Sequence, residues 1–162
     1  MFFRRQLKAE PAAQTINIFA GESNTKAKNI DLMARTIWGE ARGETLTGKE
    51  AVANVILNRF KLSQRRGKMW WGNTIEEICL KPYQFSCWNK NDPNYLKLKT
   101  ITEADPQFAI CQRIATRALN GVLPDHVFGA DHYHTVIILP DWAESRAAVA
   151  TIGHHVFYQL ER

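Results

Sequence analysis

Hydrophobic residues recur at helical spacing through most of the chain and occur only in short runs near its end. Apolar positions in residues 31–39 fit one face of a helix, and Gly39 is expected to end it. A stronger stripe over residues 51–60 predicts a second helix, which we expect to be the central buried one. Thr47 and Glu50 form a capping-box pair at its entry.

Two further helices are expected downstream. Thr74 with Glu77 repeats the capping-box signal for a short helix that ends near residue 80. Asp105, followed by a proline, is a strong start for the last helix, and Gly121 fits its end.

The pattern changes after the last expected helix. Short β-prone segments at residues 127–134, 136–139 and 155–158 are separated by polar residues. We therefore expect an α+β fold in which helices dominate, with a small antiparallel β element near the C-terminus.

Residues 1–29 show no clear period. We expect them to form an extended, mobile arm or short docking segment ahead of one catalytic domain at residues 30–162. Two arginines near the start have no apolar stretch after them, so no Sec-type signal peptide is predicted. No apolar run approaches the roughly 20 residues of a membrane helix. We therefore expect synthesis in the cytoplasm and export by another route.

The formal net charge is +5, which favours a polyanionic partner such as nucleic acid, an anionic lipid surface or an acidic wall polymer. The basic residues are spread out, apart from a cluster at Arg65, Arg66 and Lys68. Spread charge suits general attraction better than a groove that reads bases, so we expect no nucleic-acid partner. The three cysteines form no CxxC pair, and we expect them to be buried, reduced thiols.

The segment GEARGE, residues 39–44, carries the most informative chemistry. Its two carboxylates, Glu40 and Glu44, lie four residues apart on a stretch that is rich in glycine. A carboxyl group held at a helix end against apolar neighbours such as Trp38 favours its neutral form and can act as a general acid near neutral pH. The plain alternative is that both glutamates are solvated surface charges.

Six segments occur in a characteristic order: GEARGE, AVANVILNRF, YQFSCW, GADHYH, LPDW and IGHHVFY. This series resembles the cell wall hydrolase family typified by the spore cortex-lytic enzymes. The resemblance covers residues 31–158, and the most specific part is GEARGE followed closely by the valine-rich helix. It implies a lysozyme-like fold, similar to goose-type lysozymes and lytic transglycosylases.

The resemblance also implies a reaction, the cleavage of peptidoglycan glycan strands between N-acetylmuramic acid and N-acetylglucosamine. It places the catalytic glutamate at Glu40. Such an acid protonates the leaving oxygen and then acts as a base, either on water or on the muramyl 6-hydroxyl. Glu44 is a possible second carboxylate, for which we favour a structural role as acceptor for backbone N–H groups. A glutamate mechanism requires no cofactor.

Aromatic and polar side chains in the later segments are candidates for sugar binding, although each aromatic could equally pack in the core. The candidates are Tyr83, Gln84, Phe85, Ser86, Trp88, His132, Tyr133, His134 and Trp142. Of the adjacent pair Trp70 and Trp71, we expect one to be buried and one exposed.

Two other function classes compete with glycan cleavage. His132 and His134 share one face of an expected strand, which permits a zinc-dependent amidase or peptidase of the wall peptide. A third ligand is not evident, although His154, His155 or a carboxylate could supply one. We expect no metal, and we expect His154 and His155 to be peripheral. A non-enzymatic polyanion binder depends on charge alone. The single-domain size, the basic pI and the expected lack of a signal peptide favour a phage or prophage endolysin whose release depends on a holin. A bacterial autolysin exported by another path is the alternative.

Overall fold

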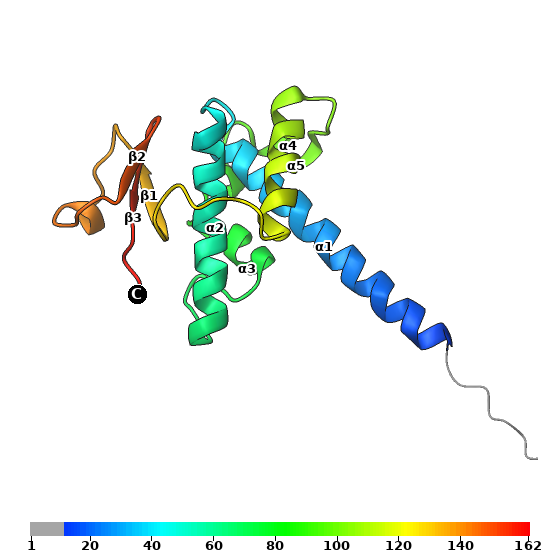
Figure 1. Ribbon diagram of the computed structural model, residues 1–162. Helices are drawn as coiled ribbons and strands as arrows, with labels where there is room; N and C mark the ends of the chain where they lie inside the picture. The colour runs from blue at the N-terminus through cyan, green and yellow to red at the C-terminus, as the bar shows by residue number, and fades with distance from the viewer. Residues whose placement is uncertain (1–11) are drawn as a thin grey trace, which may run out of the picture.

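The computed structural model describes residues 12–162, with side chains described from residue 22 onward. Helices form most of this part, and three short strands lie near its end (Figure 1). The helices are α1 Ala12–Ala41, α2 Leu46–Arg66, α3 Ile75–Leu80, α4 Tyr95–Thr100 and α5 Pro106–Leu119, with short 3-10 helices η1 Ser86–Trp88 and η2 Asp141–Ala143. The strands are β1 His132–Thr135, β2 Ala150–Ile152 and β3 His155–Tyr158. The expected α+β class with dominant helices is confirmed.

Helix α1 is much longer than the sequence pattern predicted. Residues 12–29 are its first turns, and they project from the rest of the molecule (Figure 1). They are therefore helical rather than extended, and the prediction for residues 1–11 lies outside the described residues. The helix also continues through Gly39, because this glycine allows close packing instead of ending the helix. A Cβ at Gly39 would collide with the side chain of Cys87.

Helix α2 begins earlier than predicted. Its N-cap is Thr45, whose side-chain oxygen accepts a hydrogen bond from the amide of Gly48 at 3.2 Å. The expected cap pair of Thr47 and Glu50 is therefore wrong. Glu50 is instead buried and accepts hydrogen bonds from Arg117 at 2.6 Å and from His126 at 2.7 Å.

The two downstream helices begin where their caps predicted. Thr74 and Glu77 form the complete capping box of α3. Asp105 caps α5 by accepting from the amides of the second and third residues after it. Helix α4 was not predicted, because its six residues carry no side-chain cap and bury only Leu98.

Helix α2 is the central element, as predicted. One side contributes to the main core, which it shares with α1, α3 and α5. The opposite side contributes Ala51 and Val55 to a second cluster with Val127, Ala130 and Phe157. Helix α2 therefore stands between the helical body and the sheet (Figure 1).

The sheet has the order β1-β3-β2, and both pairs are antiparallel. His132 faces Tyr158 across the first pair, and Thr135 faces His155. The predicted strand at residues 155–158 is confirmed, whereas residues 136–139 form an exposed turn and not a strand. Within residues 12–162, no helix combines the length and the apolar character needed to span a bilayer.

Candidate active site

A pocket with a volume of about 540 Å³ opens where the end of α1, the segment after α3 and strand β1 meet. Its polar lining consists of Glu40, Arg59, Tyr83, Gln84, Ser86, His132, Tyr133, His134 and Thr135. Trp70, Ile138, Pro140, Trp142 and Leu160 supply apolar wall. Among these lining residues, all in the described part of the chain, Glu40 is the only carboxylate.

Two hydrogen bonds fix the carboxylate of Glu40 within the last turn of α1. Oε1 accepts from the backbone amide of Cys87 at 3.0 Å. Oε2 accepts from the hydroxyl of Tyr133 at 2.7 Å. Because the donors come from η1 and β1, the catalytic candidate is held by both halves of the fold.

Close packing behind Glu40 brings η1 against α1. Gly39 leaves room for the side chain of Cys87, and Trp88 donates its indole N–H to Thr36 at 3.0 Å. Burial, followed by the negative charge of Glu40, raises the pKa of Cys87, so the thiol stays neutral. The contact therefore positions the Cys87 amide without placing a second charge beside Glu40.

Tyr133 supplies the donor from the sheet side. Burial and then the charge of Glu40 raise the pKa of Tyr133 well above its ordinary value, so the phenol remains a hydrogen-bond donor. The ring of His155 packs edge-on against it, with the ring centres 4.8 Å apart. His155 is buried and not peripheral as predicted, and this burial lowers its pKa. A neutral imidazole thus packs against the Tyr133 ring.

Arg59 is a pocket residue that the sequence analysis missed. Its Nε donates to the backbone oxygen of Asp131 at 2.7 Å, and its Nη1 donates to the side chain of Gln84 at 3.3 Å. Burial lowers the pKa of Arg59 to about 10, so it remains charged at neutral pH. The sequence could have revealed Arg59, because it follows Val52 by seven residues and so lies on the same buried face of α2.

His132 and His134 both line the pocket, as their spacing on one strand predicted. The Nδ1 atom of His132 lies 2.7 Å from Asp131, and His134 contacts the hydroxyl of Tyr158 at 3.0 Å through Nε2. Between residues 22 and 162, no group of three or more His, Cys, Asp or Glu side chains is placed to hold a metal ion. The described residues therefore supply no ligand set for a zinc enzyme.

Glu44 does not line the pocket. Its carboxylate contacts His154, with Oε1 2.9 Å from the ring Nδ1 and Oε2 3.4 Å from the backbone amide. A Cβ at Gly153 would collide with Oε2, so the carboxylate lies directly on the turn between β2 and β3. The structural role of Glu44 stays a prediction.

The aromatic candidates divide between the pocket and its surroundings. Trp142 and Tyr83 line the pocket, whereas Phe85 is buried in the core and only 2% exposed. Trp88 lines a neighbouring hollow. Trp70 is exposed and lines the pocket, whereas Trp71 is fully buried. The expectation that one of the two is buried and one exposed is confirmed.

Comparison with known proteins identifies the family of this chain. The family model described as Cell Wall Hydrolase matches residues 43–158, which is more than half of the chain. The chain belongs to the cell wall hydrolase family. The matched range includes Glu44 and begins three residues after Glu40, so the assignment of Glu40 depends on geometry.

Related cell wall hydrolases include the spore cortex-lytic enzyme of Halalkalibacterium halodurans, 30% identical over 151 residues that cover 87% of this chain and 37% of that protein. The spore cortex-lytic enzyme of Bacillus subtilis is 26% identical over 145 residues, which cover 90% of this chain and 41% of that protein. This chain therefore spans less than half the length of these relatives.

Two solved structures share the fold of this cell wall hydrolase. The catalytic domain of the Bacillus cereus SleB protein aligns with a TM-score of 0.58 and 27% identity, covering 81% of this chain and 89% of that one. The catalytic domain of the germination-specific lytic transglycosylase SleB from Bacillus anthracis aligns with a TM-score of 0.58 and 26% identity. The alignment covers 81% of this chain and 93% of that one. These matches confirm the expected lysozyme-like fold class.

Replacing Tyr133 with phenylalanine should lower kcat about tenfold, since it removes one hydrogen bond that orients Glu40. The apolar ring contacts remain, so KM and the melting temperature should change little. Initial rates on purified sacculi, measured with the melting curve, test this. An unchanged kcat would show that the Tyr133 hydroxyl does not position the acid.

Proposed function

We propose that this chain cleaves the glycan strands of peptidoglycan between N-acetylmuramic acid and N-acetylglucosamine, with Glu40 as general acid and base. The single carboxylate in the pocket carries the proposal, since Glu40 is oriented there by the Cys87 amide and the Tyr133 hydroxyl. The family assignment and the aromatic pocket walls support the same substrate class.

One carboxylate restricts the mechanism. Hydrolysis with retention uses a second carboxylate as nucleophile, and hydrolysis with inversion uses a second one to activate water, about 6.5–9.5 Å away from the acid. Glu44 is the nearest candidate in sequence, but its carboxylate contacts His154 and does not line the pocket. A nucleophile that belongs to the substrate satisfies the geometry, and the muramyl 6-hydroxyl is such a group.

The reaction then has two proton transfers at one residue. Protonated Glu40 gives its proton to the glycosidic oxygen as the bond from that oxygen to C1 of muramic acid breaks. The 6-hydroxyl oxygen bonds to C1 of the oxocarbenium-like centre and returns its proton to Glu40. The products are a free N-acetylglucosamine hydroxyl and a 1,6-anhydromuramyl end, and no water is consumed.

Mass spectrometry of the fragments released from sacculi tests this product. We expect 1,6-anhydromuramyl ends, which are lighter by one water than the reducing ends of hydrolysis. Reducing ends would contradict the substrate nucleophile while leaving glycan cleavage intact. Free peptides without new sugar ends would contradict glycan cleavage and favour an amidase.

The proposed place of action is the cell wall, as the substrate requires. Release through a holin, in the manner of a phage endolysin, stays a prediction of the sequence analysis.

A further inference from the structure

A second hollow lies beside the catalytic pocket, and Tyr83 lines both. This hollow, which we call the side pocket, has a volume of about 590 Å³, within the usual range for ligand sites. Residues between Leu80 and Asn91 form its lining, so the loop from α3 through η1 encloses it. Tyr83 is therefore a wall residue that the two pockets share.

The lining of the side pocket is cationic. Lys81 and Lys90 are both exposed there, and no carboxylate is among the lining residues of the described chain. None of the ion pairs found between residues 22 and 162 uses either lysine. The pKa of Glu77 is lowered first by hydrogen bonds from Asn73 and Thr74, and the charge of Lys81 is the last of its causes. Both ammonium groups are therefore available to an anionic ligand.

The other lining groups suit a peptide. Asn89 and Asn91 carry amides that can both donate to and accept from a peptide backbone. The ring of Trp88 is fixed by its hydrogen bond to Thr36 and gives a rigid apolar wall. Cations, amides and an apolar wall together match a short peptide that carries free carboxylates.

Tyr83 holds an unusual conformation on the ridge between the two pockets. The amide of Gln84 donates to the backbone oxygen of Lys81 at 3.1 Å, which closes a turn with Pro82 and Tyr83 at its centre. Tyr83 has a φ of 64° and is 89% exposed. Glycine or asparagine normally occupies this place in a turn, and a bulky residue there costs on the order of 1–3 kcal/mol. Such strain is typical of sites that contact ligands.

We propose that the side pocket binds the peptide stem of the peptidoglycan strand through the carboxylates of that peptide. The proposal rests on the proposed function, because it requires muramic acid in the catalytic pocket. The stem is joined to muramic acid through its lactyl group, on the sugar that contributes C1 to the broken bond. It must therefore leave the catalytic pocket at an edge, and the edge at Tyr83 leads to Lys81 and Lys90.

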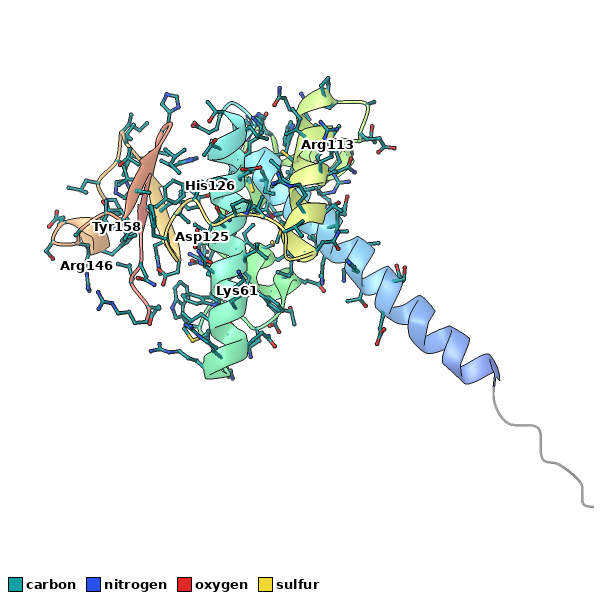
Figure 2. The ribbon with its side chains drawn as sticks, in the orientation of Figure 1. Lys61, Arg113, Asp125, His126, Arg146 and Tyr158 are labelled. Carbon is teal, nitrogen blue, oxygen red and sulfur yellow. The ribbon has the colours of Figure 1, made fainter. Side chains whose placement is uncertain are left out.

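The test compares two substrates, intact sacculi and the same sacculi stripped of stems by an N-acetylmuramoyl-L-alanine amidase. The variant Lys81→Glu/Lys90→Glu reverses both charges, and Lys81→Gln/Lys90→Gln removes them while keeping polar side chains. The matched control is Lys61→Glu/Arg113→Glu, which changes net charge equally at exposed positions on α2 and α5 that line neither pocket (Figure 2).

We expect charge reversal to lower the initial rate of glycan-end release about tenfold on intact sacculi, because the attraction of two lysines for the stem carboxylates is lost and repulsion replaces it. The rate on stripped glycan should stay near the wild-type value, and the glutamine pair should fall between. The control pair should affect both substrates equally.

Equal losses on both substrates would overturn the stem assignment and place further sugars in the side pocket. No loss on either substrate would overturn it as well. A wild-type protein that frees no glycan ends from either substrate would instead contradict the proposed function itself, and the stem assignment with it.

Discussion

Glu40→Gln should lower the release of glycan fragments from sacculi by about 10²- to 10⁴-fold, the usual contribution of a general acid-base group. The amide of glutamine cannot donate and recover the proton that the leaving oxygen requires. Its oxygen can still accept from the Cys87 amide or the Tyr133 hydroxyl. The fold should therefore persist, and circular dichroism with a melting curve checks this beside the rate.

Glu44→Gln is the matched control for this loss. It makes the same chemical change four residues away, where the carboxylate contacts His154 and not the pocket. We expect it to keep most of the activity and to loosen the turn between β2 and β3. If Glu44→Gln had no activity while Glu40→Gln remained active, Glu44 and not Glu40 would be the acid.

The parts of the fold that the sequence predicted are those with local signals. The caps of α3 and α5 use hydrogen bonds between residues two or three positions apart, so their residue types disclose them. Gly21 favours a break in a helix, but α1 continues through it. Residues 12–29 were therefore interpreted as extended, whereas they are helical.

The sheet shows where local patterns fail. Residues 136–139 are apolar but exposed, because the chain turns after β1 and does not continue as a strand. Strand β2 has only three residues and exists through its pairing with β3. Such pairings are set by the tertiary fold, and residue preferences alone do not reveal them.

The site was predictable in its main acid and not in the groups that orient it. Glu40 stands in a short motif, whereas its two donors come from positions 47 and 93 residues further along. Arg59 and Asp131 lay within quoted segments and were given no role. Both residues act through contacts with residues far away in the chain, among them the hydrogen bond that the Arg59 Nε atom donates to the Asp131 backbone oxygen.

Asp131 holds together the end of the chain, strand β1 and the pocket. Its carboxylate is buried and accepts from the amides of Leu160 and Glu161, each at 2.9 Å. The same carboxylate lies 2.7 Å from Nδ1 of His132 in the pocket wall. Burial raises the pKa of Asp131, but the hydrogen bonds from His132, Leu160 and Glu161 outweigh it, so the pKa lies below its ordinary value.

Asp131→Ala should lower the free energy of unfolding by about 2–4 kcal/mol, because it leaves two amides and an imidazole without their acceptor. Urea unfolding at pH 7 measures this loss. Asp131→Asn should cost less, since its amide oxygen can still accept. The control Asp141→Ala removes an exposed carboxylate and should change stability little.

The pH dependence of stability distinguishes the contribution of the Asp131 charge from that of its packing. A carboxyl group with a lowered pKa in the folded state stabilises the fold fully above its unfolded pKa of about 3.9. That contribution is lost as the pH falls below about 3.9 and through the folded value, because between the two pKa values the unfolded chain binds a proton that the folded chain does not. The difference between the wild type and Asp131→Ala should therefore be constant from pH 7 to about pH 5 and shrink below about pH 4. A difference that stayed the same down to pH 3 would show that Asp131 acts by filling space and not by its charge.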